Sequence, residues 1–452
     1  STQFIRGFWL MKNFKPMLFT DLAHYDKKQF FADVVSGIIV AVIALPLSIA
    51  LAIASGVTPE AGIYTAIIAG FLTALFGGSS VQIAGPTAAF ATIVAGIVAR
   101  SGTDGLALAT VLAGLFLLIM GLLGLGNLIR FIPYTITTGF TAGIAVTLVI
   151  GQLKDFCGVR YPAGVSPIET IEKAKAFGEN ISTVNFEAVL VGAVCLAILF
   201  LWPKVSDKIP ASLIAVAVGI AAVQIFHLNV LTIGDQFTLS SQLPTFRLPS
   251  LSFEKSAAVL PDAVTIAVLA GIESLLSCVV ADGMVNKHHR SNTELCAQGI
   301  ANIGSALFGG IPATGAIART AANIRNGGRT PVSGMVHSAV LLLILVLLMP
   351  YASYIPMPSI AAILIHVAYN MCGARQFARI IKASPKSDIA VLLVTFVLTV
   401  VFDLVVAIGV GVGMACILFM KRMSDESRIS GWKYDENDEN LRKIPEYVRV
   451  YE

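Results

Sequence analysis

Charged residues are scarce in this sequence. Asp, Glu, Lys and Arg together make up 13% of its 452 residues, while hydrophobic residues make up 56%. Average soluble domains carry about a quarter charged residues, so the composition nearly excludes a soluble enzyme and predicts an all-α integral membrane protein. The formal net charge of +4 is small, and the basic residues of inner loops account for it without a nucleic-acid partner.

The sequence also lacks a cysteine or histidine pattern that would hold a metal. Its six cysteines are far apart and mostly in apolar runs, so we expect small core residues rather than disulfides or ligands: Cys157, Cys195, Cys278, Cys296, Cys372 and Cys416. We interpret the histidines as structural or solvated. A nucleophile–base pair is not apparent either. The sequence therefore predicts that the protein is not an enzyme and uses no cofactor or metal.

One apolar region, residues 308–324, contains too many helix breakers for a continuous membrane helix. The breakers are Gly309, Gly310, Pro312 and Gly315. We expect an extended segment over 311–313, followed by a short helix that begins within the membrane at about Thr314. Backbone that is broken at this depth is tolerated only where it lines a cavity or is buried in protein.

The same sequence pattern occurs earlier in the chain. Residues 73–78 (TALFGG) match residues 305–310 (SALFGG) at every position but the first, and a second break follows in residues 83–90 (IAGPTAAF). Two interrupted segments at corresponding places in two halves predict a transporter whose binding site lies between the halves. The alternative is that the glycines only allow close helix packing. Close packing alone does not require a repeated hexapeptide followed by a break.

Each predicted break ends where a helix begins, and such a helix start can bind an anion. Its first N–H groups have no partner within the helix, and the helix dipole adds about half a positive charge there. The residues at the two starts are small or carry a hydroxyl: Thr87 and Ala88 at the first, and Thr314, Gly315 and Ala316 at the second. The alternative interpretation is that the threonines only cap the helices.

The apolar runs predict about fourteen membrane-spanning segments, of which the third and the tenth are broken. The basic loops fall on one side if both termini are cytoplasmic, which favours two inverted halves of seven spans. The expected divisions are a cytoplasmic N-terminal segment (1–32), a first repeat with spans one to seven (33–226), an extracytoplasmic connection (227–261), a second repeat with spans eight to fourteen (262–420), and a cytoplasmic linker that leads into a truncated soluble domain (421–452). Among the spans, we expect the first over 33–54, the third to end near residue 99, the fourth over 106–125, the sixth over 186–201, the seventh over 211–226 and the eighth from residue 261.

Two ionisable residues lie where a membrane helix makes them costly. Glu273 is in the middle of the eighth span, where a charged side chain costs about 2.5–3.5 kcal/mol. Protonation removes that charge, so Glu273 is a candidate proton carrier, or a sodium ligand with nearby oxygens such as that of Ser277. The alternative is a structural carboxyl group bonded between helices. Arg319, in the short helix, either adds to the field that attracts an anion or reaches the inner surface.

Several sequence motifs resemble those of the SulP anion transporters, the sulfate-permease and solute-carrier-26 type. They are DVVSGII (33–39), ALPLS (44–48), AGPT (84–87), LPDA (260–263), SNTEL (291–295) and GGRT (327–330). The resemblance implies seven-plus-seven inverted repeats arranged as core and gate domains, a C-terminal STAS domain that begins near Tyr447, and a homodimer.

The resemblance also implies roles for individual residues. The anion is expected between the starts of the third and tenth helices, at Thr87, Ala88, Gly315 and Ala316. Pro46 and Leu47 of the first helix would face it, and Arg319 would be the arginine of the tenth helix. The coupling carboxylate falls on Glu273. Ser277 lies where sodium-coupled members offer a hydroxyl, so sodium coupling would use Glu273, Ser277 and Gly315.

The expected function is secondary active anion transport across a bacterial inner membrane, by a core that moves against a gate like an elevator. Glu273, together with the motifs IESLLS (272–277) and VADGM (280–284), resembles the bacterial branch that takes up C4-dicarboxylates, such as succinate and fumarate, with protons. The alternatives are sodium-coupled bicarbonate or sulfate transport, and an uncoupled anion channel. A channel needs no titrating carboxyl group, which speaks against that alternative.

Overall fold

The computed structural model describes residues 14–126, 134–162, 167–206, 209–250 and 253–402, and within the segment 407–420 residues 407, 409–411, 413–418 and 420. In chain order the helices are α2 (Met17–Asp21), α3 (Lys27–Ala54), α4 (Pro59–Phe76), α5 (Ala88–Leu122), α6 (Tyr134–Cys157), α7 (Thr170–Glu179), α8 (Phe186–Leu201), α9 (Ala211–Phe226), α10 (Ile233–Gln236), α11 (Phe253–Val285), α12 (Ser291–Leu307), α13 (Ile317–Arg325), α14 (Val332–Leu348), α15 (Met357–Cys372), α16 (Ala374–Ala383) and α17 (Lys386–Val401), and the strands are β1 (Ala84–Gly85) and β2 (Thr314–Gly315).

The described helices confirm an all-α membrane protein. Eight helical segments are long and apolar enough to cross a bilayer, and they contain α3, α4, α5, α6, α8, α11, α14 and α15. The count of fourteen spans and the division into two repeats stay predictions. The linker over 421–452, with the expected start of a soluble domain, lies outside the described residues, as do residues 404–406, 408, 412 and 419 of the expected fourteenth span (404–420).

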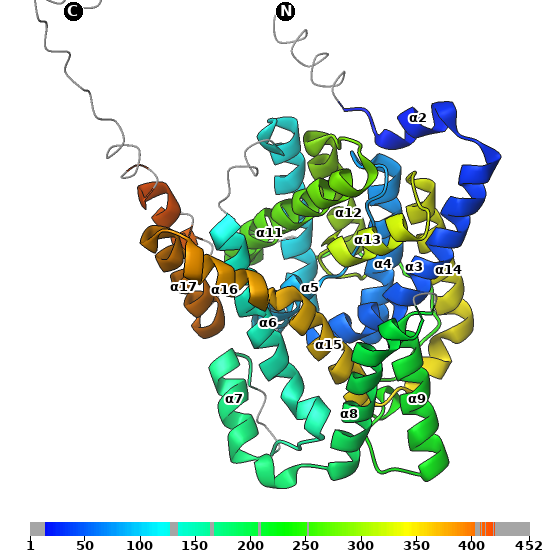
Figure 1. The fold of residues 1–452 in the computed structure, drawn as a ribbon, viewed down its shortest axis with the longest axis vertical. Helices are drawn as coiled ribbons and strands as arrows, with labels where there is room; N and C mark the ends of the chain where they lie inside the picture. Colours follow the sequence, from blue (N-terminus) through cyan, green and yellow to red (C-terminus); the bar gives the residue numbers. More distant parts are fainter. Residues whose placement is uncertain are drawn as a thin grey trace, which may run out of the picture.

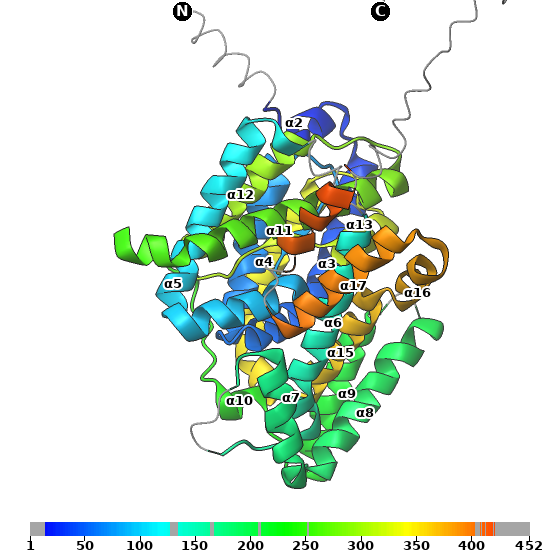
Figure 2. The same ribbon diagram turned by 90° about the vertical axis from the view of Figure 1, so that its left-hand side faces the viewer.

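The helices form two groups, each built from both halves of the sequence (Figures 1 and 2). Helices α3, α4, α5, α11, α12, α13 and α14 pack mainly on one another, and α6, α8, α9, α15 and α17 form the second group. In the first group, α5 and α12 approach closely at Gly114 and Gly299. A Cβ atom on either glycine would lie 2.6 Å from the carbonyl oxygen of the other, so this contact needs residues without a side chain.

Several helix bounds agree with the predicted spans and others extend beyond them. Helices α8 and α9 begin and end where the sixth and seventh spans were predicted. Helix α3 begins at Lys27 rather than at residue 33, because the Asp26 side chain caps it by accepting a hydrogen bond from the Gln29 amide (2.7 Å). Helix α11 begins at Phe253 and includes Pro261, so the eighth span does not start at that proline.

The predicted third and fourth spans are the two parts of α5, which turn at Gly102. This glycine has φ 67° and ψ −174°, a backbone conformation that is essentially restricted to glycine. The chain therefore kinks at Gly102, between the two helical parts of α5.

The predicted helix start at Thr314 is wrong by three residues. Thr314 and Gly315 form strand β2, which pairs antiparallel with β1, and α13 begins only at Ile317. The physical reason is that the two broken segments satisfy each other's backbone groups by pairing, which two opposed helix starts cannot do.

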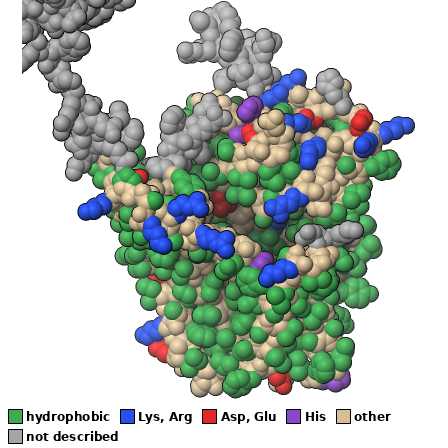
Figure 3. All heavy atoms as spheres, viewed as in Figure 1, with side chains coloured by type: hydrophobic (Ala, Val, Ile, Leu, Met, Phe, Trp, Pro, Cys, Tyr) green, Lys and Arg blue, Asp and Glu red, His purple; other side chains and the backbone are tan. Residues whose placement is uncertain are grey.

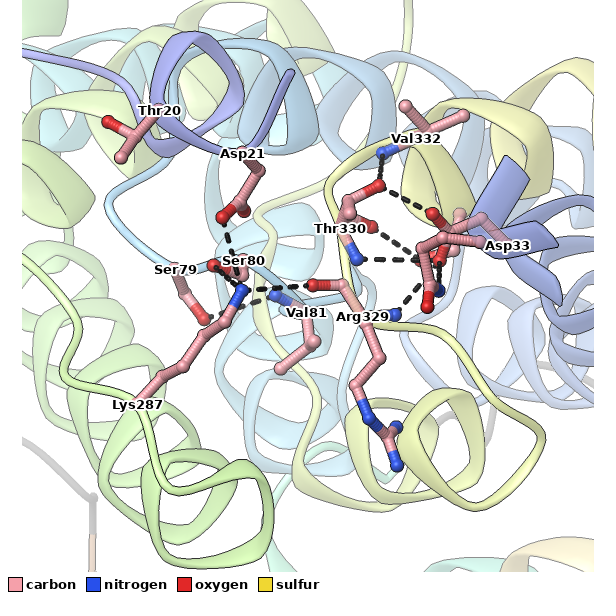
Figure 4. Close-up of polar contacts among 12 residues, drawn as sticks. Thr20, Asp21, Asp33, Ser79, Ser80, Val81, Lys287, Arg329, Thr330 and Val332 are labelled. Atoms are coloured by element: carbon pink, nitrogen blue, oxygen red, sulfur yellow. Dashed lines mark hydrogen bonds and ion pairs between the residues drawn. The ribbon is translucent and has the colours of Figure 1, made fainter. Parts of the chain in front are cut away.

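Polar side chains tie the loop after α13 to α3, to the loop after α11 and to the N-terminal segment (Figure 4). The Asp33 carboxylate, which is fully buried, accepts hydrogen bonds from the Arg329 amide (2.9 Å) and the Thr330 hydroxyl (2.6 Å). The Lys287 ammonium group bonds to Asp21 (3.1 Å), to Ser80 (3.4 Å) and to the Arg329 carbonyl oxygen (3.5 Å). Asp33 therefore anchors the N-terminal part of α3 to the loop after α13.

Candidate functional site

Strands β1 and β2 bring the two broken segments into direct contact. Ala84 is opposite Gly315, and Gly85 is opposite Thr314. The pairing continues where the Ala316 amide donates to the Ile83 carbonyl oxygen (2.9 Å). Each strand leads into a helix, so the starts of α5 and α13 lie on either side of this crossing. Both helix starts are therefore adjacent to the paired strands, and the predicted anion site would lie between them.

Neither N-cap residue uses its side chain to cap its helix. Thr87 precedes α5 and Ala316 precedes α13, and no side-chain capping bond forms at either position. The Thr87 hydroxyl instead donates to the Glu273 carboxylate, at 3.0 Å. Both Thr87 and Glu273 are half-buried. The alternative that Thr87 only caps its helix is therefore wrong: it is the N-cap residue of α5, but its side chain links that helix start to the middle of α11.

The face of the molecule seen in Figure 3 is hollowed, with an acidic side chain in the hollow and lysine and arginine side chains around it. At the start of α13, Ile317 is 45% exposed, while Arg319 is 1% exposed. One side of this helix start is therefore open, and the other side is enclosed by protein. The open side is where a ligand could approach the backbone N–H groups.

Arg319 does not reach a membrane surface. Its guanidinium is buried, and one nitrogen donates to the Ser48 hydroxyl (3.3 Å) and to the Pro86 carbonyl oxygen (3.2 Å). Two further guanidinium nitrogens are buried without a hydrogen-bond partner. The interpretation of Arg319 as a side chain that reaches the inner surface is therefore wrong. Its charge lies beside the first break, and its contribution to the field at the two helix starts stays a prediction.

Helix α3 lines the same region through the motif that contains Pro46. Pro46 is buried within the helix, Leu47 is half-buried, and the next residue, Ser48, accepts the hydrogen bond from Arg319. This contact places the motif beside the first break. The expected contact of Pro46 and Leu47 with the anion stays a prediction.

The other predicted residues lie deeper. Ser277 bonds to Thr320 of α13 (3.4 Å). Thr314 is fully buried, and its hydroxyl bonds to Ser274 (2.6 Å) and to the Ala270 carbonyl oxygen (3.0 Å). The structure therefore brings Thr87, Glu273 and the two helix starts together, whereas the hydroxyls of Thr314 and Ser277 hold α13 and β2 against α11.

A buried polar stripe on α12 is absent from the sequence-based expectations. It consists of Glu294, Gln298, Asn302 and Ser305, all fully buried. The Asn302 amide exchanges two hydrogen bonds of 2.9 Å with the backbone of Ala313, and Ser305 donates to the Ile311 carbonyl oxygen (2.7 Å). The stripe therefore satisfies backbone groups of the broken segment. The available signal was the spacing of its members, three or four residues apart on one helix face.

The sequence pattern of the sulfate permease family matches residues 30–395. The chain belongs to this family. It is 43% identical over 414 residues to the putative sulfate transporter YvdB of Bacillus subtilis, an alignment that covers 90% of this chain and 76% of that protein. It is 34% identical over 436 residues to the bicarbonate transporter BicA of Picosynechococcus, covering 94% of this chain and 76% of that protein.

Solved structures agree with the family. The transmembrane domain of a cyanobacterium bicarbonate transporter BicA matches with a TM-score of 0.77 and 32% identity, covering 85% of this chain and 98% of that one. The murine Slc26a9 anion transporter in the inward-facing state matches with a TM-score of 0.82 over 90% of this chain and 71% of that one; at 17% identity it shows the fold alone. These findings confirm a multi-pass anion transporter of the sulfate permease family and not an enzyme.

Proposed function

We propose that this sulfate permease family member is a secondary active transporter of small inorganic anions, with sulfate and bicarbonate as the first candidates. The anion would bind between the starts of α5 and α13, and Glu273 would bind the coupling ion. The observation that carries this proposal is the hydrogen bond from Thr87 to Glu273 (3.0 Å). It joins the start of one of the two helices to an acidic group in the middle of an apolar helix.

The anion site is supported by the charges and backbone groups around it. Two helix starts contribute unpaired N–H groups and partial positive charge, and the buried Arg319 contributes a full positive charge nearby. Oxyanions such as sulfate and bicarbonate accept several hydrogen bonds at once and therefore suit such a site.

The coupling role of Glu273 is supported by its surroundings. Among the described residues, the Thr87 hydroxyl supplies the hydrogen bond recorded for this carboxyl group. A hydroxyl can donate to an ionised carboxylate or accept from a protonated one, so the contact can persist in both states. We propose a proton as the coupling ion. Sodium coupling through Glu273, Ser277 and Gly315 is the alternative outcome of the experiment below.

The substrate class is argued from the relatives. Two relatives that align with most of this chain are named for sulfate and bicarbonate. The expectation of C4-dicarboxylates came instead from the resemblance of two short motifs, residues 272–277 with Glu273 and residues 280–284. The names of these two relatives favour inorganic anions as the substrates of this protein. Dicarboxylate uptake becomes an outcome to be tested.

The proposed cycle moves one group of helices against the other. The group with α3, α4, α5 and α11 to α14 holds both helix starts and would act as the core, and the group with α6, α8, α9, α15 and α17 would act as the gate. The basic residues between α11 and α12 and after α13 would face the cytoplasm of a bacterial cell. The bacterial relative YvdB is consistent with this location. A homodimer stays a prediction.

The test is uptake of radiolabelled sulfate, bicarbonate and fumarate into proteoliposomes under an imposed pH gradient or an imposed sodium gradient. We expect the wild type to concentrate sulfate or bicarbonate with the pH gradient alone. Glu273→Gln should lose concentrative uptake but keep counterflow of the same anion, because the helix starts are unchanged. Glu60→Gln is the matched control, since Glu60 is a buried carboxyl group that accepts from the Ser240 amide (2.8 Å).

Each other outcome changes the proposal in a defined way. Uptake that requires sodium would make sodium the coupling ion. Uptake of fumarate without uptake of sulfate or bicarbonate would make C4-dicarboxylates, rather than inorganic anions, the substrates. If Glu273→Gln concentrates the anion as well as the wild type does, Glu273 is a structural carboxyl group and the coupling assignment is wrong.

A further inference from the structure

A second buried carboxyl group, Glu294 of α12, lies close to the proposed anion site and has no role in the proposed transport cycle. It is fully buried. One carboxylate oxygen accepts from the Gly78 amide (2.9 Å), and the other accepts from the side-chain amides of Gln298 (2.9 Å) and Gln82 (3.3 Å). All three partners are N–H donors, which is the environment of an ionised carboxylate.

Gln82 connects this carboxylate to the two broken segments. Its side-chain nitrogen donates to Glu294 and also to the Ser274 carbonyl oxygen (3.0 Å). A side-chain amide has two N–H groups, so each bond can use its own hydrogen. The amide also lies directly against β2, because a Cβ atom added to Gly315 would overlap its nitrogen. Gly315 is therefore required by the packing of Gln82.

Ser274 completes the connection from the other side. The Gly315 amide donates to the Ser274 hydroxyl (3.0 Å), which also bonds to the Thr314 hydroxyl (2.6 Å). Both residues of β2 are therefore held by Ser274, whose carbonyl oxygen is held by Gln82. Helix α13 begins two residues after Gly315, so a displacement of β2 displaces that helix start.

We propose that Glu294 is a positioning residue for anion binding, which acts through Gln82 on β2 and the start of α13. This inference rests on the proposed function. The negative charge of Glu294 orients the Gln82 amide with its nitrogen toward both Glu294 and Ser274. Ser274 in turn holds Gly315 at the place where the anion would meet the backbone.

The charge matters because a neutral amide of the same shape would reverse these contacts. In Glu294→Gln, the new amide oxygen would stay on the Gly78 amide, since a backbone N–H cannot rotate. The new amide nitrogen would then face Gln82, whose own oxygen is buried without a partner. Gln82 would rotate to present that oxygen and would place it against the Ser274 carbonyl oxygen as well, which breaks the bond to Ser274.

The experiment compares Glu294→Gln, Gln82→Met and the double variant by hydrogen exchange and by transport kinetics. Gln298→Met is the matched control, because Gln298 donates to the same oxygen of Glu294 and is equally buried, but among the described residues its side chain forms no hydrogen bond with either broken segment. Exchange is followed in the peptide that contains Gly315. Transport is followed as the KM and maximal rate of sulfate and bicarbonate uptake.

We expect Glu294→Gln and Gln82→Met each to accelerate exchange at Gly315 and to raise KM by about tenfold, with the maximal rate changed less than about twofold. The double variant should resemble the more affected single variant, because both changes break one connection. Gln298→Met should lower stability while leaving KM and the exchange at Gly315 close to the wild-type values.

Additive effects of the two changes, or equal effects of Gln298→Met on KM and exchange, would show that Glu294 acts only through general stability and would overturn the proposal. Unchanged exchange in Glu294→Gln would overturn it as well. If Glu294→Gln does not fold, Gln82→Met alone tests the proposal. Exchange at Gly315 must then be faster in Gln82→Met than in the wild type, and unchanged exchange would overturn the proposal. Exchange needs no substrate, so it tests the positioning role even if the wild type transports neither anion.

Discussion

The buried carboxylate of Asp33 is expected to respond very differently to two substitutions. Besides Arg329 and Thr330, it accepts hydrogen bonds from the Tyr25 hydroxyl (3.0 Å) and the Gln29 side chain (3.0 Å). It therefore joins α3, the N-terminal segment and the loop after α13 (Figure 4). Asp33→Ala removes the acceptor altogether, whereas Asp33→Asn keeps one acceptor oxygen in place.

The magnitudes follow from which donors lose their partner. In Asp33→Ala, the Arg329 amide and the Thr330 hydroxyl lose their acceptor, and each unsatisfied buried group costs about 1–3 kcal/mol. The expected loss in the free energy of unfolding is therefore about 2–6 kcal/mol. In Asp33→Asn, the remaining oxygen can accept from the Arg329 amide, while the hydroxyls of Tyr25 and Thr330 can turn to accept from the new amide. Only the charge assistance is lost, at about 1–2 kcal/mol.

The assay is denaturant-induced unfolding of the purified protein in detergent micelles, with Asp104→Ala as the control. Asp104 is exposed on α5, so its replacement should change the free energy of unfolding by less than about 0.5 kcal/mol. The expected order of stability is wild type, Asp33→Asn and then Asp33→Ala. If the two Asp33 variants are equally destabilised, the charge and not the set of hydrogen bonds holds this loop, and the reasoning fails.

Two further predictions concern backbone strain and pH. Gly102→Ala should cost about 1–3 kcal/mol from strain alone, because a Cβ atom there has no neighbour within 4 Å. Gly151→Ala, at an equally open position within α6, should instead stabilise the protein by about 0.4–1 kcal/mol. If both substitutions changed the free energy of unfolding in the same direction, this prediction would be contradicted. Burial and the nearby Asp33 carboxylate raise the pKa of Tyr25 to about 12 from 10.0, so its contribution to stability is complete below pH 10 and disappears as the pH rises toward 12. The difference in stability between wild type and Tyr25→Phe should therefore be constant below pH 10 and shrink above it, and a difference that grows there would contradict the assignment.

The helices and the breaks could be predicted because their signals are local. The apolar runs of α8 and α9 are bounded by polar residues, and their ends were predicted correctly. The glycines and prolines before α5 and α13 marked both interruptions. The extension of α3 to Lys27 and of α11 to Phe253 was missed, since helical backbone continues beyond the apolar run and hydropathy does not record it.

The pairing of β1 with β2 could not be predicted in the same way. Two-residue strands are too short to show an alternating pattern, and their partners are more than 200 residues apart in the sequence. The direction of Arg319 depends on the same pairing, because the guanidinium donates to Pro86 at the end of the first break. A contact between residues so far apart in the sequence cannot be predicted from the pattern of neighbouring residues.

Three buried or half-buried carboxyl groups show why residue type alone does not assign a role. Asp33 accepts five hydrogen bonds and Glu294 accepts three, all from N–H or O–H groups that hold backbone or side chains in place. Both carboxyl groups are therefore enclosed by donors and act as acceptors that hold their neighbours in place. Glu273 instead meets one hydroxyl, which can reverse its direction, and it is the least enclosed of the three. The number of donors around each group therefore distinguishes Glu273, which we propose binds the coupling ion, from Asp33 and Glu294, which hold neighbouring segments in place.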